Sequence, residues 1–424
     1  MEKKLPDNWV ETTLGDIAEW SSGGTPRRGV KEYYSGDIPW IKTGDLNDGI
    51  IHEASEYISE EGLNNSSAKL FPIGSVAIAM YGATIGKTGL FAINAATNQA
   101  CGVAKPYFEM NVFIHYLLKS QKQAFIDKGK GGAQPNISQT VIKAHKIGLP
   151  PLLEQKRIVT KLDGLFAHLE EVKIRLEKVS QLLKDFRQAV LTKAVTGKLT
   201  KKKGSWERTT LGEVAIITMG QSPPGTSYNT TGDGVPLING PVEFGGIDPF
   251  SRTKKVKYTT EPTKMCEEND LLICVRGSTT GRLNIAGFDA CIGRGVASIQ
   301  STEVEQKYIN IFMRLQYAKI LSEGTGSTFP SISGSYIKSF VIDMPIDSTE
   351  QKKIVLHVET LFSKAEAIEE KYSTVKQKAD KLPQAILAKA FRGELVEQFS
   401  YDGDANELLK EIQKLKSELK KKSK

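Results

Sequence analysis

The sequence contains little of what catalysis or a disulfide-bonded core would require. Four cysteines and five histidines stand among 424 residues, and neither set has the close ligand spacing of a zinc site. The cysteines form no CxxC pair; they are Cys101, Cys266, Cys274 and Cys291. We therefore expect reduced, mostly buried thiols.

Long apolar segments are also missing. A run of about 18 apolar residues, which a membrane helix needs, does not occur. The N-terminal MEKKLPDNWV has no apolar core of the kind that a signal peptide carries. These absences predict a cytoplasmic protein with no membrane span and no signal peptide.

The glycine-rich segments do not complete a nucleotide-binding motif. In YGATIGKT (81–88) only three residues separate Gly82 from Gly86, and the matching GSTTGRL (277–283) lacks the Lys-Ser/Thr ending of a phosphate-binding loop. SPPG (222–225) resembles the Pro-Pro loop of amino-methyltransferases, but Gly225 stands where those enzymes have an aromatic residue. Spacing supports no Ser–His–Asp or paired-carboxylate site either. The sequence thus predicts a chain that is not an enzyme and holds no metal or cofactor.

Length and charge leave room for a large, basic, globular protein. The chain exceeds the size that one core usually serves, so we expect two or more domains. Hydrophobic residues are 39% and charged residues 25% of the chain, as in ordinary globular proteins. The net charge is +8 and the pI is about 9.0, which suits a polyanionic partner but does not establish one.

What the sequence does contain is one unit present twice. TTLGDIA (12–18) returns as TTLGEVA (209–215), each three residues after a tryptophan. PNIS (135–138) returns as PSIS (330–333), EQKRIV (154–159) as EQKKIV (350–355), and QAVLTKAVTGKL (188–199) as QAILAKAFRGEL (384–395). The offset stays between 195 and 197 residues. Two copies of this length indicate a duplicated domain rather than a solenoid.

Each copy has a globular part and a helical part. Residues 1–150 and 200–345 carry short apolar runs bounded by Gly and Pro, which predict strands. They also carry one amphipathic helix each, over 111–129 and 306–324. Residues 151–199 and 346–424 predict a long helix each, the second followed by a short amphipathic helix in 404–424. We expect the tail helix to pack on this chain's own helices or on a partner. The fold class is α+β, internally duplicated.

Both long helices carry apolar residues at alternating steps of four and three, which is typical of a coiled coil. The helices can lie antiparallel around a pseudo-twofold axis, or each can pair with another protein. Pro383 is predicted to kink the second helix or to split it near Lys381. The seam consists of Ile158, Leu162, Leu165, Leu169, Val172, Leu176, Val179, Leu183, Phe186 and Val190, and of Ile354, Val358, Leu361, Ala365, Ile368, Tyr372, Val375, Ala379, Leu382 and Ile386.

The turn-rich segments carry basic and amide side chains among glycines, and the two copies differ most there. Lys and Arg neutralise phosphates, Arg suits guanine, and Asn or Gln suits adenine. A constant scaffold with divergent loops favours two readers of two DNA sequences. The candidate DNA-binding residues are Arg27, Arg28, Lys31, Tyr81, Lys87, Gln99, Lys130 and Gln134 in the first copy, and Arg252, Lys254, Lys255, Arg276, Arg282 and Arg294 in the second.

The ordered, repeated motifs resemble those of the specificity subunit (HsdS) of type I restriction–modification systems, over nearly the whole chain. The resemblance implies two α/β-type target recognition domains, separated by an antiparallel coiled coil, that each read half of a split site in double-stranded DNA. It implies two methyltransferase (HsdM) subunits, with S-adenosylmethionine, and HsdR subunits, with ATP and Mg, as partners. The alternatives are a specificity subunit for a fused restriction–methyltransferase system and a coiled-coil scaffold that does not bind DNA.

Overall fold

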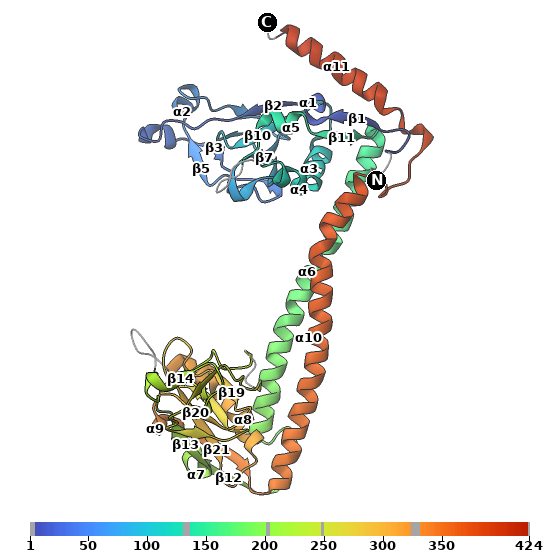
Figure 1. The fold of residues 1–424 in the computed structure, drawn as a ribbon. Coiled ribbons are helices and arrows are strands. Elements are labelled where there is room, and N and C mark those ends of the chain that lie inside the picture. The colour runs from blue at the N-terminus through green and yellow to red at the C-terminus, as the bar shows by residue number, and fades with distance from the viewer. Residues whose placement is uncertain (1–4, 130–135, 201–203, 247–249, 324–330, 423–424) are drawn as a thin grey trace. The chain divides into compact units, whose positions relative to one another are not determined.

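A computed structural model describes residues 5–129, 136–200, 204–246, 250–323 and 331–422. The chain divides into two compact units, and Figure 1 shows the elements of each. Unit 1 takes residues 1–175 and 375–424, and unit 2 takes residues 176–374. The long helices α6 (Leu152–Val195) and α10 (Ser348–Ala390) each contribute one segment to both units. No helix among the described residues is long and apolar enough to cross a membrane.

The globular part of unit 1 is built on two sheets and a strand pair. Its central strand β7 has four buried residues in a row, as expected for a strand covered on both faces. One sheet has the order β2-β10-β7-β8-β4 and the other β5-β3-β9-β6, while β1 pairs with β11. The strands are β1 (Val10–Thr13), β2 (Ala18–Ser22), β3 (Ile38–Ile41), β4 (Gly49–Ile51), β5 (Glu56–Ile58), β6 (Leu70–Phe71), β7 (Val76–Ala79), β8 (Thr88–Phe91), β9 (Ala95–Thr97), β10 (Cys101–Pro106) and β11 (Lys146–Leu149). The short helices are α1 (Leu14–Ile17), η1 (Lys31–Tyr34), α2 (Glu60–Asn64), η2 (Gly82–Thr84), α3 (Asn111–Ser120), α4 (Lys122–Asp127) and α5 (Gln139–Lys143).

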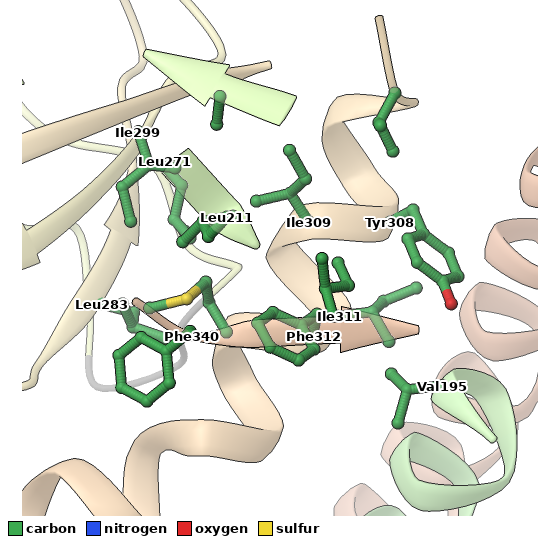
Figure 2. Close-up of a cluster of buried hydrophobic side chains, with 14 of the residues drawn as sticks. Val195, Leu211, Leu271, Leu283, Ile299, Tyr308, Ile309, Ile311, Phe312 and Phe340 are labelled. Atoms are coloured by element: carbon green, nitrogen blue, oxygen red, sulfur yellow. The ribbon is translucent and has the colours of Figure 1, made fainter. Parts of the chain in front are cut away.

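Unit 2 repeats this plan. Its sheets have the orders β13-β21-β18-β19 and β14-β16-β15-β20-β17, and β12 pairs with β22. In its core, side chains of α8 lie with those of β18, β19 and β21 and with Val195 at the end of α6 (Figure 2). The strands are β12 (Trp206–Thr210), β13 (Ala215–Met219), β14 (Tyr228–Asn229), β15 (Val235–Ile238), β16 (Lys257–Thr259), β17 (Met265–Cys266), β18 (Leu271–Cys274), β19 (Leu283–Ile285), β20 (Ala290–Ile292), β21 (Val296–Ser301) and β22 (Val341–Pro345). The short helices are α7 (Leu211–Val214), η3 (Gly225–Ser227), α8 (Gln306–Glu323) and α9 (Gly334–Lys338).

The repeated motifs close each globular part where the chain enters and leaves it. In unit 2, Thr210 caps α7 in a capping box with Glu213, and the Leu211 N–H donates to the Phe340 carbonyl at 2.8 Å. Ser333, the last residue of PSIS, caps α9 through the Tyr336 N–H at 3.1 Å. The first copy repeats two of these contacts, Leu14 with His145 and Ser138 with Val141. In place of the capping box, the Thr13 hydroxyl donates to the Asp16 carboxylate.

Two glycines let these short helices touch. A Cβ on Gly15 would lie 3.1 Å from the Lys143 side chain, and one on Gly212 would lie 2.9 Å from the Lys338 side chain. The glycine in both copies of TTLG therefore brings α1 onto α5 and α7 onto α9. The motifs are the scaffold of the unit, which explains why they are alike in both copies.

The EQK motif ties each globular part to its long helix. The Gln155 side chain donates to the Pro150 carbonyl, and the Gln351 side chain donates to the Pro345 carbonyl, each at 2.8 Å. In unit 1 the fully buried Glu154 carboxylate also accepts from the Trp9 indole at 3.0 Å. Burial raises the pKa of Glu154, and the hydrogen bonds from Trp9 and Asn8 oppose that rise.

The predicted amphipathic helix of the first copy is broken, whereas that of the second copy is continuous. The prediction of a single helix over 111–129 is wrong, because α3 ends before Gln121 and α4 begins after it. The Gln121 N–H donates to both the Leu117 and the Leu118 carbonyls, a tightened last turn. Its side-chain oxygen lies 3.1 Å from the His145 ring. A contact from distant sequence thus holds the break.

The long helices meet end to start within each unit. In unit 2 the end of α6 shares a core with the start of α10, and Arg187 pairs with Glu369 at 2.7 Å. In unit 1 the start of α6 shares a core with the end of α10. Helix α10 continues through Pro383, so the predicted split is wrong. Proline removes one backbone hydrogen bond, and the packing of Leu387 and Ala390 just beyond it holds the helix.

The predicted seam is buried in part. Nine of its positions are buried: Ile158, Leu162, Leu169, Leu183, Val190, Ile354, Val358, Ala365 and Ala379. Five are exposed: Val172, Phe186, Ile368, Val375 and Leu382. The remaining six are half-buried. The helices of this chain therefore leave apolar side chains uncovered in their middle sections.

The C-terminal tail forms the expected amphipathic helix, α11 (Ala405–Lys422), which packs on unit 1. Leu408 and Ile412 are buried in the core of that unit, while Leu419 is exposed. The Lys416 ammonium donates to the Gly15 carbonyl at 2.9 Å. Before the helix, Asp402 accepts from Arg157 of α6 at 2.6 Å. Within this chain the tail helix lies against the short helix α1.

We expect acid to destabilise unit 1 through two histidines that the second copy lacks. Burial lowers the pKa of both histidines to about 4. The nearby positive charge adds to this effect, from Lys119 at His115 and from Lys128 at His145. Below the ordinary value of 6.5 the unfolded chain gains protons that the folded chain does not. This stability is therefore full above pH 6.5 and is lost as pH falls toward 4. For His115 the loss from pH 7 to 5 is about 2 kcal/mol, and solvent screening makes the loss for His145 smaller.

Urea unfolding followed by tryptophan fluorescence at pH 7 and 5 measures this loss, since Trp9, Trp20 and Trp40 all lie in unit 1. The control variant carries His115→Asn and His145→Phe, the residues at the matched positions of the second copy. Equal pH dependence in the control and the wild type would contradict the prediction.

Candidate nucleic-acid interface

In unit 1 the end of β7 lies between two turns. The Met80 N–H donates to the Ala100 carbonyl, and the Ile137 N–H donates to the Met80 carbonyl, each at 2.9 Å. Tyr81 follows, in an isolated bridge with Asn136. The Tyr81 and Gln99 side chains are exposed. Two candidates from separate segments are thus brought to one edge of the sheet.

Unit 2 has the same backbone arrangement with different side chains. The Val275 N–H donates to the Gly295 carbonyl at 2.9 Å, and the Ile332 N–H donates to the Val275 carbonyl at 3.0 Å. Arg276, in a bridge with Ser331, takes the place of Tyr81, and Arg294 takes the place of Gln99. Both arginines are exposed, and neither has an ion-pair partner among the residues that the structure describes.

A hollow of about 460 Å³ adjoins Arg276. It is lined by Met219 of β13 and by residues 331–334 and Tyr336 at the start of α9. Ser333 and Gly334 therefore form the start of α9 and also line the hollow. The edge that carries Arg276 is concave, with polar backbone and hydroxyl groups around an exposed guanidinium.

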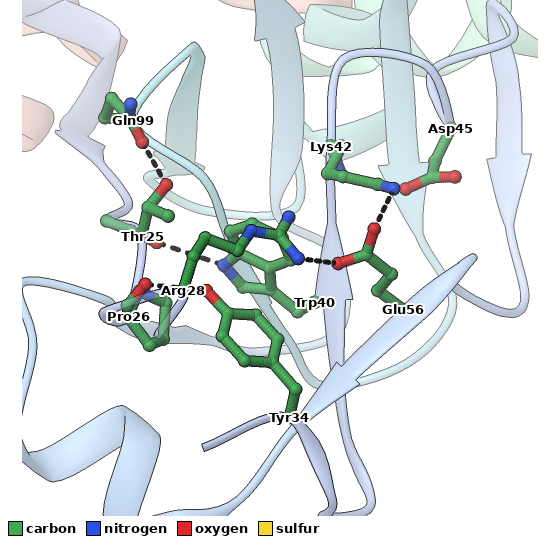
Figure 3. Close-up of polar contacts among 10 residues, drawn as sticks. Thr25, Pro26, Arg28, Tyr34, Trp40, Lys42, Asp45, Glu56 and Gln99 are labelled. Carbon is green, nitrogen blue, oxygen red and sulfur yellow. Dashed lines mark hydrogen bonds and ion pairs between the residues drawn. The ribbon is translucent and has the colours of Figure 1, made fainter. Parts of the chain in front are cut away.

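The loop after β2 folds onto the same edge in unit 1, as Figure 3 shows. The Thr25 hydroxyl donates to the Gln99 side chain, and the Gly24 N–H donates to the Thr97 carbonyl at 2.9 Å. Thr25 was not among the sequence candidates, because a lone threonine in a loop gives no signal. The contact fixes the oxygen of Gln99 and leaves its amide nitrogen to donate.

Arg28 is held within this loop (Figure 3). Its guanidinium lies 4.5 Å from the ring centre of Tyr34 and 5.0 Å from that of Trp40, and it pairs with Glu56 at 2.8 Å. Hydrogen bonds from Lys42 and then from Arg28 lower the pKa of Glu56. The pairing orders the loop, and the exposed neighbours Arg27 and Lys31 lie on that ordered loop.

The other candidates are placed less uniformly. Lys87 is half-buried after the β7–β8 turn. Arg252 pairs with Glu268 at 3.1 Å, Lys255 lies over Phe288 at 5.1 Å, and Lys254 is exposed. Lys130 and Gln134 lie outside the described residues. Arg282 is half-buried and donates to the Gly246 carbonyl at 2.8 Å, so it points away from the edge that carries Arg276 and toward the helices of unit 2.

The comparisons with known proteins bear on this duplicated arrangement. The family model described as the type I restriction modification DNA specificity domain matches residues 6–179 and again residues 203–377. The chain belongs to this family. Its role is DNA sequence recognition in a restriction–modification system, as a specificity subunit without catalytic activity. Its partners are DNA and the other parts of such a complex.

Individual relatives agree. The EcoKI specificity subunit of Escherichia coli strain K12 is 28% identical, over 93% of this chain and 91% of that one. The EcoBI specificity subunit of Escherichia coli is 29% identical, over 93% of this chain and 88% of that one. A relative from Methanocaldococcus jannaschii is 35% identical over 263 residues, which cover 59% of this chain and 60% of that relative.

Solved structures have the same fold. A chain from a structure of the type I restriction–modification system, solved for its complex assembly and conformational transition, covers 92% of this chain and 100% of its own, with 25% identity and a TM-score of 0.75. The HsdS subunit of Thermoanaerobacter tengcongensis covers 93% of this chain and 99% of its own, with 24% identity and a TM-score of 0.63. The expected duplicated α+β arrangement is confirmed.

Proposed function

We propose that each globular part of this specificity subunit reads one half of a bipartite, asymmetric DNA site. The observation that supports this is the paired edge: the same backbone hydrogen bonds hold Tyr81 and Gln99 in unit 1 and Arg276 and Arg294 in unit 2. A constant frame with exchanged side chains suits two readers of different sequences. Arginine matches guanine and glutamine matches adenine in the major groove, so we assign a guanine contact to unit 2 and an adenine contact to unit 1.

We further propose that α6 and α10 form an antiparallel coiled coil that sets the spacing of the half-sites. The buried seam residues and the Arg187–Glu369 pair support this role. Two methyltransferase subunits would dock along the helices, where seam residues such as Val172 and Ile368 are exposed. These methyltransferase subunits would bind S-adenosylmethionine, and HsdR subunits would bind ATP and Mg. The whole complex would act in the cytoplasm.

Domain exchange tests independent reading. Replacing residues 210–340 with the matching segment of another family member is expected to change one half of the methylated sequence and to keep the other. The cut points lie at the Leu211–Phe340 hydrogen bond, beside the β12–β22 pair, so the graft replaces the loops and keeps the junction with the helices. Mapping methylated adenines in cells that carry the methyltransferase measures both halves.

The matched control exchanges residues 13–145 and should change only the other half-site. Independent reading would be wrong if either exchange altered both halves. Loss of all methylation would point to failed assembly, which co-purification with the methyltransferase detects.

A further inference from the structure

Unit 2 has a second hollow, of about 360 Å³, between the long helix α6 and the globular part. Its lining gathers cationic and hydrogen-bond-donating side chains from three elements, with two leucines and no carboxylate. The lining residues are Lys184, Arg187, Gln188 and Leu191 of α6, Arg282 and Leu283 at β19, and Arg314 and Tyr317 of α8. Four cations around one hollow without an acid among them is the composition of an anion site.

Neighbouring groups fix the cations in place. Arg282 donates to the Gly246 carbonyl at 2.8 Å and lies 5.7 Å from the ring centre of Phe244. The Arg314 guanidinium lies against the rings of Phe250 and Phe362, 4.6 and 4.9 Å from their centres, and these two rings also contact each other. These contacts fix two of the guanidinium groups that line the hollow before any ligand arrives, so little side-chain order would have to be gained on binding.

Two donors at this hollow are buried without an acceptor. The Nε atoms of Arg187 and Arg282 have no hydrogen-bond partner among the described residues. The Arg187–Glu369 pair uses the Nη2 atom of Arg187 and leaves its Nε unpaired. A buried donor without an acceptor is unfavourable, and an oxyanion in the hollow would supply the acceptor.

The matched place in unit 1 has a different composition. By the repeat, Lys184 corresponds to Asp380 and Arg187 to Pro383, while Arg282 and Arg314 correspond to Lys87 and Lys119. A cation is thus replaced by a carboxylate and another by an apolar residue. The scaffold of the duplication does not require the four cations, so their presence in unit 2 calls for a separate explanation.

We propose that this hollow in unit 2 binds a phosphate group, held by Lys184, Arg187, Arg282 and Arg314. Guanidinium groups match phosphate oxygens in geometry, and ammonium adds a point charge. The phosphate belongs either to a DNA backbone or to a small phosphate-bearing ligand. Only the DNA source rests on the proposed function, since a small ligand would bind the free chain.

The first experiment titrates the full chain with inorganic pyrophosphate by calorimetry, in a low-salt buffer without phosphate. The variant Lys184→Asp places the first copy's residue in the hollow, and its exposed position keeps folding intact. We expect its pyrophosphate affinity to fall at least tenfold, roughly the effect of reversing one charge at close range. The matched control is Lys178→Ala, an exposed lysine of the same helix that does not line the hollow.

The second experiment measures duplex DNA binding at several salt concentrations with the same variants. A lost backbone contact lowers the slope of log K against log salt by about 0.9. A lower slope for Lys184→Asp, but not for Lys178→Ala, assigns the hollow to a DNA phosphate. Lost pyrophosphate binding with an unchanged slope assigns it to a small ligand.

Unchanged pyrophosphate affinity together with an unchanged DNA slope overturns the proposal. If the chain bound no DNA at all, the proposed function would fail, and the pyrophosphate titration alone would still decide the hollow.

Discussion

Replacing Arg276 and Arg294 together with alanine is expected to weaken binding to the recognition site by about 2–6 kcal/mol, at least ~30-fold. Each arginine that contacts a guanine edge contributes about 1–3 kcal/mol of discrimination. Both arginines lie at the edge of unit 2 that is equivalent to the Tyr81 edge of unit 1, and both are exposed without an ion-pair partner among the described residues. The measurement is fluorescence anisotropy on a duplex carrying the mapped site, with the chain bound to its methyltransferase.

The loss should be confined to one half-site. Base changes in the half read by unit 2 should cease to matter in the double variant, whereas changes in the other half should still weaken binding. Arg208→Ala is the matched control, because Arg208 is exposed in the same unit but pairs with Asp343 on the β12–β22 junction. Uniform weakening at every sequence would show phosphate contacts instead of base contacts. Unchanged affinity would remove this edge from the interface.

A conservative exchange sharpens the assignment. Arg294→Gln places the first copy's residue at the matched turn of unit 2. Glutamine pairs with adenine where arginine pairs with guanine, so a G-to-A change in the half-site should partly restore binding of this variant. Restoration by no single base change would mean that Arg294 contacts the backbone.

The duplication made much of this structure predictable. Two copies of TTLG, P-x-IS and EQK mark the same junctions twice, and the structure shows each motif as a cap, a close helix contact or a helix tie. The repeat marked the positions of these junctions, whereas the contacts that close them, such as Leu211 with Phe340, join distant segments. The tail helix was equally accessible, since its four-three spacing is local.

Contacts between distant segments were not predictable in this way. The helix break at Gln121 depends on His145 from the far end of the globular part. The continuity of α10 through Pro383 depends on the core of unit 1. Neither dependence leaves a trace in the local pattern, in which one helix looked continuous and the other interrupted.

For the candidate DNA-binding residues as well, the sequence predicted some features and not others. The sequence placed Arg276 and Arg294 correctly at turns after strands, but it could not show that Arg28 pairs with Glu56 or that Arg282 points toward α6. The hollow of unit 2 combines residues 184 to 317, which no spacing rule connects. Type and rough location of basic side chains were predictable; their partners were not.

Lengthening both long helices by one heptad is expected to move the half-sites apart while leaving their sequences unchanged. The predicted seam from Ile158 to Val190 spans 33 residues, about 50 Å at 1.5 Å per residue. Seven added residues extend a helix by about 10 Å and keep the seam in register. Insertion after Val179 and after Val375, which are matched by the repeat, lengthens both helices by the same amount.

The spacer should lengthen by about three base pairs, because B-DNA rises about 3.4 Å per pair. Each added pair also turns the second half-site by about 35° around the DNA axis, so the new spacer is set by distance and rotation together. Methylation mapping in cells gives both the half-sites and the spacer. A heptad in one helix alone is the control: it leaves unmatched seam residues, which should lower the melting temperature and abolish methylation. An active, doubly extended subunit with its original spacer would show that the helices do not set the distance.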